Sequence, residues 1–244
     1  MKNTQTPTRP ILRYLGGKWK LAKWIISHFP EHQIYCEPFG GGASVLLQKK
    51  PVYQEIYNDL NGEVVNVFRI LRDPEKANEL KHLIINTPYS RTEFFSAYKS
   101  SDDITDVEQA RRTITKSFMG FSTDSIERNT GMNGRGMTGF RNAGKTFYWK
   151  TPTDYWSEYP EHINIFASRL KNVCIEKKDA IELIDQVNNP DTLLYVDPPY
   201  LNRSSRTNYR YDIDKDYHEK LLQTLNEFVG SVVLSAYDSE LYDN

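Results

Sequence analysis

The chain has 244 residues, of which 39% are hydrophobic and 26% are charged, and its net charge is −1. These values describe a globular protein with one large α/β domain, or with one domain that carries an insertion. The sequence also excludes membrane-spanning helices, because no apolar run approaches the ~20 residues that such a helix needs.

Short apolar strands alternate with helices in the first third of the chain. We predict, in order, a helix over 20–29, a strand over 34–37, a glycine turn over 38–42, a helix over 43–49, a strand over 54–57 and a helix over 61–72. The next helix starts at Asp73, because an aspartate cap followed by proline is a strong helix start. This alternation predicts a parallel, doubly wound, Rossmann-like sheet.

The pattern changes at about residue 87. Ser90 with Glu93, and Thr105 with Glu108, predict capping boxes that open two helices. Residues 122–150 show no helical or strand period and are too long for an ordinary connection. Regular elements return as a helix over 160–170, strands over 173–176, 192–196 and 231–234, and a helix over 216–228. We predict an α/β domain made of 1–86 and 166–244, interrupted by a mostly helical and loop insertion over 87–165.

Cys36 and Cys174 are the only cysteines, and each lies in a predicted strand. We expect both to be reduced core residues. No metal-ligand spacing exists in the sequence, so no metal is expected. The first ten residues also lack the apolar core of a secretory signal, and we expect a cytoplasmic protein.

Basic residues are segregated from acidic ones in three places. Residues 1–30 and 128–150 contain lysines and arginines but no acid. Three arginines also lie between Pro199 and the next acid, Asp212. Segregated charge can build a basic face on a neutral protein, and such a face binds phosphates. The alternative is that these segments are solvated loops that lack acids by chance. Because three separate segments show the same pattern, we favour the basic face.

The strand over 192–196 ends in Asp197-Pro198-Pro199-Tyr200. Prolines stiffen the chain and cannot join a ladder, so nearby carbonyls stay available. A carboxylate, carbonyls and a ring therefore gather at the carboxyl end of a strand, where open α/β sheets bind ligands. The alternative is a plain Pro-Pro turn with Tyr200 in the core.

A second candidate site is the turn Glu37-Pro38-Phe39-Gly40-Gly41-Gly42, with Asp59 beyond the next strand. Glycines let a ligand approach the backbone closely. Asp59 lies 19 residues after Gly40, and in nucleotide-binding folds an acid about 20 residues after such a turn contacts ribose hydroxyls. The pattern fits NAD or a nucleoside-bearing methyl donor equally well. The alternative is a tight turn in which Asp59 caps a helix.

The run Gly134-Arg135-Gly136-Met137-Thr138-Gly139 matches G-x-G-x-x-G in form. No strand precedes it and no apolar helix follows it, although a nucleotide-binding turn requires both. We interpret it as a flexible basic loop.

Four features occur in one order along the chain: Tyr14-Leu15-Gly16-Gly17-Lys18, the glycine turn, Asp59 and Asp197-Pro198-Pro199-Tyr200. Together they resemble the Dam-like, alpha-group DNA adenine-N6 methyltransferases over nearly the whole chain. The tracts 57–61 and 235–242 also resemble segments of that family. The resemblance implies a methyltransferase fold, S-adenosylmethionine as cofactor, double-stranded DNA as partner, and a target-recognition role for the insertion.

The resemblance also implies residue roles. The cofactor would be bound by Tyr14, Lys18, Phe39, Gly40, Gly42, Asp59, Asp179 and Asp197. The catalytic residues would be Asp197, Pro198 and Tyr200: the Asp197 carboxylate and the Pro198 carbonyl would hold the N–H groups of a flipped-out adenine, and Tyr200 would stack on it. The basic segments would lie along DNA through Arg128, Arg135, Arg141, Lys145, Arg203 and Arg206.

Other functions were weighed against this one. Methylation of cytosine N4 or of RNA keeps the fold but changes the substrate. A catalytically weak or inactive DNA-binding protein would keep only the methyltransferase fold. The intact signature Asp197-Pro198-Pro199-Tyr200 argues against this alternative. An NAD oxidoreductase is disfavoured because no acid/base set for hydride transfer accompanies the glycine turn. The sequence indicates neither the DNA recognition site nor whether a restriction endonuclease accompanies the chain.

The resemblance raises one expectation about the end of the chain. Relatives continue past the segment similar to 235–242 with a helix and closing strands. We therefore expect an incomplete sheet edge beside the strand over 231–234, with reduced stability or completion by a partner segment.

Overall fold

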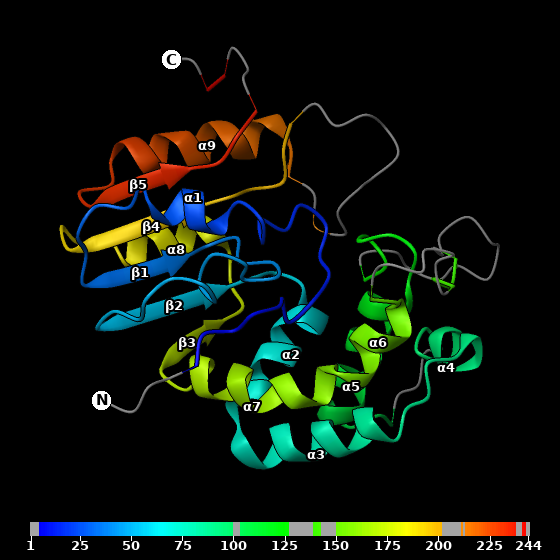
Figure 1. The fold of residues 1–244 in the computed structure, drawn as a ribbon. Helices are drawn as coiled ribbons and strands as arrows, with labels where there is room; N and C mark the ends of the chain where they lie inside the picture. The colour runs from blue at the N-terminus through cyan, green and yellow to red at the C-terminus, as the bar shows by residue number, and fades with distance from the viewer. Residues whose placement is uncertain are drawn as a thin grey trace. The chain divides into compact units, whose positions relative to one another are not determined.

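The computed structural model describes residues 5–99, 103–126, 139–142, 150–201, 211, 213–237 and 241–242. Its helices are α1 (Ala22–Ile26), α2 (Gly62–Arg72), α3 (Pro74–Ile85), α4 (Arg91–Ser96), α5 (Asp106–Met119), α6 (Pro152–Ser157), α7 (Tyr159–Leu170), α8 (Ala180–Gln186) and α9 (Lys215–Asn226). Its strands are β1 (Ile34–Glu37), β2 (Gln54–Asn58), β3 (Val173–Glu176), β4 (Thr192–Val196) and β5 (Ser231–Leu234) (Figure 1). No helix among the described residues is long and apolar enough to cross a membrane.

The chain folds into two compact units. One, which we call the helical unit, contains Met1–Gly17 and Asn66–Lys171; the other, the sheet unit, contains Lys18–Val65 and Asn172–Asn244. The boundaries of these units differ from 1–86, 87–165 and 166–244, which the change in sequence pattern predicted. The predicted division into a catalytic domain and a target-recognition insertion stays a prediction.

The sheet unit is built on one parallel sheet with the strand order β3-β2-β1-β4-β5. β1 lies between β2 and β4, so the connections run outward from β1 in one direction and from β4 in the other. This confirms the predicted doubly wound fold. Because all strands are parallel, their carboxyl ends lie at one edge, and the change of direction between β1 and β4 marks the place where such folds bind ligands.

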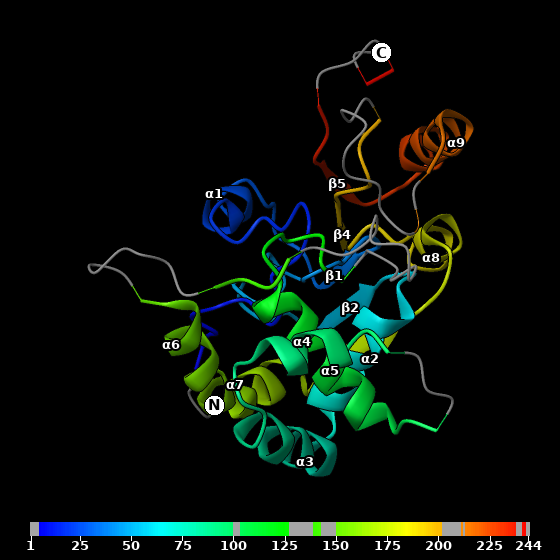
Figure 2. The ribbon, with the colours of Figure 1, turned by 90° about the vertical axis from the view of Figure 1, so that its right-hand side faces the viewer.

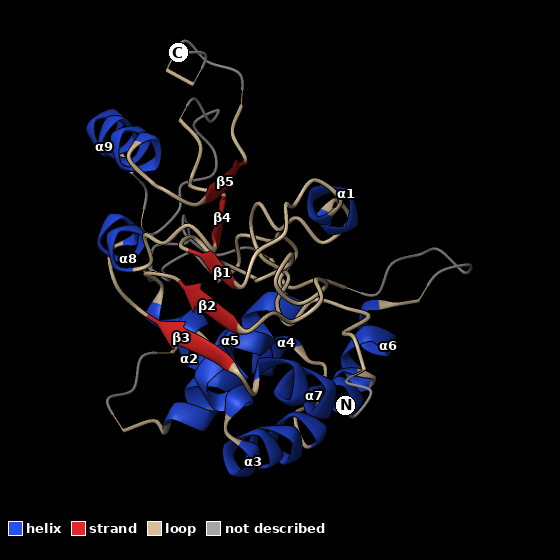
Figure 3. Ribbon diagram, turned by 90° about the vertical axis from the view of Figure 1, so that its left-hand side faces the viewer, coloured by secondary structure: helices blue, strands red, loops and turns tan. Residues whose placement is uncertain are grey.

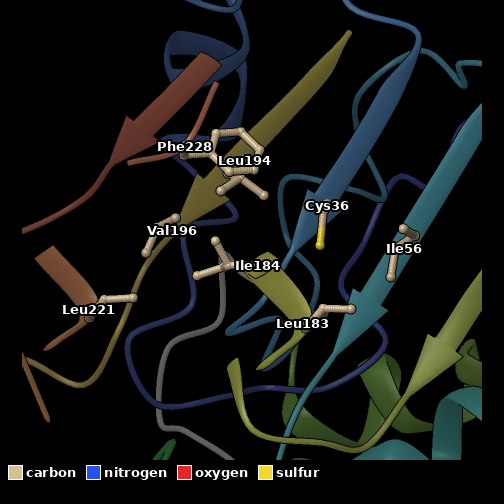
Figure 4. Packing of buried hydrophobic residues seen from close by; sticks show 8 residues of the cluster. All are labelled: Cys36, Ile56, Leu183, Ile184, Leu194, Val196, Leu221 and Phe228. Atoms are coloured by element: carbon tan, nitrogen blue, oxygen red, sulfur yellow. The ribbon is translucent and has the colours of Figure 1, made fainter. Parts of the chain in front are cut away.

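Helices cover both faces of this sheet. Figure 3 shows α8 and α9 on one face and α1 on the other. On the first face a buried apolar cluster joins the strands to the two helices (Figure 4). The cluster consists of Cys36, Ile56, Leu183, Ile184, Leu194, Val196, Leu221 and Phe228. Burial on both faces explains why β4 has an almost continuous apolar sequence.

The two cysteines have different environments. Cys36 is fully buried in β1, as predicted, whereas Cys174 in β3 is exposed, so that prediction was wrong. β3 is the last strand at its side of the described sheet. Side chains alternate along a strand, and the neighbouring Val173 takes the buried side.

The helix predicted over 43–49 was also wrong, because these residues form successive turns. Ala43 has a φ of 50°, in the left-handed region that a right-handed helix excludes. The Glu37 carboxylate also accepts the Leu46 amide at 2.6 Å, a donor that a continuous helix would direct to residue 42. α1 is likewise shorter than the predicted helix over 20–29.

The helical unit packs α3 against α5 and α7 (Figure 2). Asp73 caps α3 through the amides of Glu75 and Lys76, as predicted. The predicted capping boxes are only half formed. Ser90 and Thr105 accept the expected amides, but the two glutamates of these motifs bind Arg111 instead. A complete capping box at Thr151 and Asp154, which was not predicted, opens α6.

Candidate active site at the carboxyl edge of the sheet

The Asp197 carboxylate lies where β4 leaves the sheet. Lys18, from the segment before α1, reaches this carboxylate, and its Nζ is 2.8 Å from Oδ1 and 2.6 Å from Oδ2. The Lys18 and Asp197 side chains expose only 14% and 17% of their surface. The predicted catalytic carboxylate is therefore paired with a residue that was predicted to contact the cofactor.

Tyr200 and Ser235 complete the surroundings of Asp197. The Tyr200 hydroxyl donates to Asp197 Oδ1 at 2.9 Å and lies 3.0 Å from Ser235 Oγ. Ser235 follows β5, and its amide donates to the Val196 carbonyl at 2.8 Å. The pairing of β4 with β5 thus brings Ser235 to the signature. The exposed ring of Tyr237 meets the Tyr200 ring nearly edge-on, with 4.6 Å between the ring centroids.

Burial and the ion pair act in opposite directions on this carboxylate. Burial raises the pKa of Asp197, while Lys18, Tyr200 and Ser235 favour the ionised form and limit the rise. Burial acts to lower the pKa of Lys18, but the Asp197 carboxylate outweighs it and the net shift is upward. The Lys18 Nζ also lies 5.1 Å from the centre of the Tyr200 ring. The ammonium group is thus held as a cation, and it helps to keep the buried carboxylate ionised.

The Pro198 carbonyl was predicted to be available for a ligand. Pro198 is buried, and no described residue donates a hydrogen bond to its carbonyl. The structure therefore places an acceptor with spare capacity directly after the Asp197 carboxylate.

The glycine turn is pressed against β2. A Cβ at Gly40 would lie 2.3 Å from a carbon of the Tyr57 ring, so only glycine fits there. The Gly40 amide donates to the Asn58 carbonyl at 2.7 Å, and the Tyr57 hydroxyl donates to the Gly41 carbonyl at 2.8 Å. Gly41 has a φ of 47°, which glycine adopts at little cost. Close packing between strands thus explains part of the glycine pattern.

Asp59 organises the same turn. Its Oδ2 accepts the Gly41 amide at 2.8 Å, and its Oδ1 accepts the Asn61 amide at 2.7 Å. The contact with Asn61 resembles the capping role that was the alternative interpretation of Asp59. A carboxylate oxygen can accept two hydrogen bonds, so these contacts are compatible with a further one from a ribose hydroxyl.

Asn58 joins the ends of three strands, and the sequence had assigned no role to it. Its Nδ2 donates to the Pro38 carbonyl at 2.8 Å, in the turn after β1. The same Nδ2 donates to the Lys178 carbonyl at 3.0 Å, and its Oδ1 accepts the Lys178 amide at 2.9 Å, in the loop after β3. Asn58 is almost fully buried at the end of β2. It thereby fixes the turns that carry Phe39, the glycines and Asp179.

The other predicted cofactor residues of the sheet unit have structural partners. Asp179 caps α8 by accepting the amides of Ile181 and Glu182, and its Oδ2 accepts the Tyr217 hydroxyl at 2.8 Å. Phe39 is partly buried and packs against the apolar cluster. Gly42 is buried in the turn. All these residues lie at the carboxyl edge of the sheet, where the sequence placed them.

Two predicted site residues that the structure describes belong to the helical unit. Tyr14 precedes a turn in which the Gly17 amide donates to the Tyr14 carbonyl at 3.2 Å. Arg141 is partly exposed, and its amide donates to the carbonyl of Met119, the last residue of α5. The remaining predicted DNA contacts lie outside the described residues: Arg128, Arg135, Lys145, Arg203 and Arg206.

The carboxyl edge of the sheet includes residues to which the sequence had assigned no role. Ser235, Tyr237 and Asn58 lie in the tracts 57–61 and 235–242, which had been noted only as family-like segments. The signal that could have found them is their position, because each lies at or just beyond the carboxyl end of a strand of a parallel sheet.

A sequence model of the D12 class N6 adenine-specific DNA methyltransferases matches residues 14–244. The chain belongs to this family. Among characterised relatives it is similar to Type II methyltransferase M.MjaIII of Methanocaldococcus jannaschii, with 25% identity over 85% of this chain and 76% of the relative. It is also similar to Type II methyltransferase M1.LlaDCHI of Lactococcus lactis subsp. cremoris, with 26% identity over 84% of this chain and 71% of the relative.

A third relative is DNA adenine methylase of Haemophilus influenzae, with 23% identity over 82% of this chain and 67% of the relative. The prediction of a Dam-like enzyme that methylates adenine N6 in DNA is confirmed by this membership.

Proposed function

We propose that this D12 class methyltransferase uses S-adenosylmethionine to methylate N6 of an adenine that is flipped out of duplex DNA into the site at Asp197. The observation that carries this proposal is the pair of acceptors at the end of β4. The Asp197 carboxylate is largely buried and paired with the Lys18 ammonium, which opposes the rise that burial causes in its pKa, and the adjacent Pro198 carbonyl accepts no hydrogen bond from the described residues. A primary amine with two N–H groups matches this pair.

The residues of the glycine turn fit the proposed cofactor. Asp59 has the carboxylate oxygens that a ribose requires, and Asp179 lies in the next loop along the same edge. We propose that these two acids, with Phe39, Gly40 and Gly42, hold the nucleoside part of S-adenosylmethionine, and that Tyr14 also contributes. When bound, this cofactor supplies a methyl group on a positively charged sulfur atom.

Asp197 and Pro198 would act by orienting the amine. The N6 lone pair of adenine is delocalised into the ring, which makes N6 a poor nucleophile. Two acceptors that each hold one N–H group favour a pyramidal nitrogen and direct its lone pair at the methyl carbon. In the transfer the N6–carbon bond would form, the sulfur–carbon bond would break, and N6 would lose one proton, for which we propose the Asp197 carboxylate as the acceptor. The rate gain then comes from positioning and fixed charge.

Lys18 would favour this step in a way the sequence did not suggest. Its ammonium group binds both carboxylate oxygens of Asp197, so the acceptor is ionised before the base arrives. An incoming amino group must share or displace one of these contacts. We propose that Lys18 positions and charges Asp197, in addition to any contact with the cofactor.

Aromatic rings next to Asp197 would hold the flipped base. A base inside a duplex cannot reach such a site, so it must leave the stack. Tyr200 carries the hydroxyl bound to Asp197, and the Tyr237 ring packs against it. Base–aromatic stacking contributes about 1–3 kcal/mol per base. We propose that Tyr200 supplies this stacking face and that Tyr237 supports it.

The helical unit contains the whole of the predicted target-recognition insertion. We propose that residues 87–165 recognise double-stranded DNA, with Arg141 among the contacts and with the basic residues at 128, 135, 145, 203 and 206 completing the path. DNA as substrate and two free cysteines favour a cytoplasmic location. The helical unit would then supply sequence recognition, and the sheet unit the chemistry.

Product identification tests the proposal directly. Duplex DNA is incubated with the purified chain and S-adenosylmethionine labelled on its methyl group, and the DNA is then digested to nucleosides. We expect the label in N6-methyl-2′-deoxyadenosine. Label in N4-methylcytosine would overturn the substrate, and transfer only to single-stranded DNA or RNA would overturn the duplex. No transfer at all would favour an inactive DNA-binding protein.

A further inference from the structure

The end of α5 carries a short two-stranded stem in the helical unit. Gly120 and Phe140 form an antiparallel bridge. On either side of it, the Phe121 amide donates to the Gly139 carbonyl at 2.8 Å, and the Arg141 amide donates to the Met119 carbonyl at 2.7 Å. The stem therefore returns Arg141 to the carboxyl end of α5.

Arg13 from the amino-terminal segment clamps this stem. Its guanidinium Nη1 donates to the Gly120 carbonyl at 2.9 Å and to the Ser117 carbonyl at 3.3 Å. Its main chain is fixed as well, because the Ser117 hydroxyl accepts the Arg13 amide at 2.7 Å and donates to the Arg13 carbonyl at 3.1 Å. The Arg13 charge is thus held at the base of the same stem that carries Arg141.

The two arginines form a cationic pair without an acid. Among the described residues, neither Arg13 nor Arg141 makes an ion pair with a carboxylate. Burial and then the charge of Arg141 lower the pKa of Arg13 to about 10. Arg111 in the same unit shows the contrast, because the hydrogen bonds that it donates to the Glu108 carboxylate raise its pKa and Glu93 adds a second ion pair.

The geometry keeps this pair together despite the repulsion. The Tyr89 hydroxyl donates to the Arg141 carbonyl at 2.7 Å, which anchors the stem beside α4. Arg13 Nε and Nη2 make no hydrogen bond with a described residue, and both arginines are partly exposed. The Arg13 guanidinium is thus fixed by Nη1 while Nε and Nη2 stay able to bind, and no described carboxylate pairs with either arginine. Charged donors of this kind match a phosphate group.

We propose that Arg13 and Arg141 together bind one backbone phosphate of the DNA substrate. This inference rests on the proposed function, because it assigns a contact to the DNA of that reaction. It adds Arg13, which was not among the predicted DNA contacts, and it gives Arg141 a role in positioning the duplex. A phosphate contact fixes register and orientation but carries no sequence information.

The experiment measures the affinity of the full chain for a duplex with its methylation site, as a function of salt concentration. Arg141→Gln is the main variant, because the Arg141 side chain makes no hydrogen bond with another residue that the structure describes. We expect about tenfold weaker binding at 0.1 M salt. We also expect the slope of log K against log salt to fall by about one, as one phosphate contact is lost. Arg13→Gln should match it, and the double variant should lose little more.

Arg112→Gln is the matched control, because Arg112 belongs to the same unit but pairs with Glu108. It should leave the slope unchanged. Duplexes that carry one neutral methylphosphonate, scanned along both strands, should include one position where wild type and Arg141→Gln bind equally. Equal slopes for wild type and Arg141→Gln would overturn the phosphate site. Reduced affinity without such a position would overturn the single-phosphate contact.

Binding of S-adenosylmethionine and identification of the product separate this test from that of the proposed function. If wild type methylates adenine but Arg141→Gln keeps the full salt slope, only the phosphate site fails. If wild type binds duplex DNA with the expected slopes but transfers no methyl group, the proposed function fails and the phosphate site stands.

Discussion

The Lys18 ammonium lies 2.6 Å from Asp197 Oδ2 and 2.8 Å from Oδ1. It therefore donates hydrogen bonds to the same carboxylate that we propose as the acceptor for the amino group of adenine. An ammonium group and an exocyclic amine are both N–H donors. The resting site is therefore satisfied without substrate, and no buried charge is left unpaired. Binding of the base then exchanges one donor for another, which avoids the cost of desolvating a bare carboxylate.

Replacing Asp197 tests the chemical assignment. Asp197→Ala removes the charged acceptor, and we expect kcat to fall by at least about 10²-fold, as when a fixed transition-state hydrogen bond is lost. The dissociation constant for S-adenosylmethionine should change little. Asp191→Ala, an exposed aspartate before β4, is the matched control and should keep wild-type turnover. Near-normal turnover of Asp197→Ala would show that the carboxylate does not hold the reacting amine.

Removing Lys18 tests its effect on the ionisation of Asp197. Burial raises the pKa of Asp197, and the Lys18 cation opposes this rise. Without that cation the protonated carboxyl is favoured further, so in Lys18→Gln the acid limb of the kcat profile should move to higher pH. At pH above this limb the variant should recover part of its activity. An unmoved limb with a weakened affinity for S-adenosylmethionine would instead assign Lys18 to the cofactor alone.

Two substitutions separate the ring of Tyr200 from its hydroxyl. Tyr200→Ala removes the stacking face, and we expect binding of the flipped base to weaken by about 1–3 kcal/mol. Tyr200→Phe keeps the ring but removes the hydrogen bond to Asp197 Oδ1, so KM for DNA should stay close to wild type while kcat falls. Fluorescence of 2-aminopurine at the target position reports base flipping in both. Equal flipping in Tyr200→Ala and wild type would remove the stacking role.

Asn58 should control cofactor binding without touching the reacting atoms. Asn58→Ala leaves the Pro38 carbonyl and both main-chain groups of Lys178 without partners. We expect a loss of about 3 kcal/mol in the free energy of unfolding and a weaker affinity for S-adenosylmethionine, with kcat at saturating cofactor less affected. Asn86→Ala, which removes an exposed side-chain hydrogen bond after α3, is the control. A drop in kcat with unchanged cofactor affinity would contradict this positioning role.

Local patterns predicted most of the elements but not the contacts between distant ones. The strand over 192–196 was found with its bounds because its apolar run and the following prolines are both local signals, and Asp73 capped its helix as expected. The helix over 43–49 failed because the Glu37 side chain, outside that segment, binds the Leu46 amide. Tertiary contacts overrode the local preference there.

The sequence predicted at which edge of the sheet the candidate residues lie, but not which of them bind one another. Parallel strands bring their carboxyl ends together, so the sequence could place Asp59, Asp179 and Asp197 at one edge. It could not predict that Lys18 binds Asp197, since the two are 179 positions apart and no spacing rule connects them. Ser235 was missed for the same reason, because only the pairing of β4 with β5 places it beside Tyr200.

Gly40 offers a test of whether the glycine turn is shaped by packing. A Cβ at Gly40 would lie 2.3 Å from the Tyr57 ring and 3.0 Å from the Asn58 carbonyl, and neither the buried ring nor the strand backbone can yield easily. We expect Gly40→Ala to destabilise the chain by about 1–3 kcal/mol through overpacking. It should also weaken S-adenosylmethionine binding, because the displaced turn carries the Gly41 amide away from Asp59.

Gly62→Ala is the matched control for this substitution. Its added Cβ would meet only the flexible end of the Lys177 side chain, at 3.1 Å. Gly62 is the first residue of α2, where alanine is the better helix former. Thermal unfolding should therefore show a lower Tm for Gly40→Ala and an equal or higher Tm for Gly62→Ala. If both variants kept wild-type Tm and cofactor affinity, the turn would be free to move away from Tyr57, and close packing would not explain the glycine at position 40.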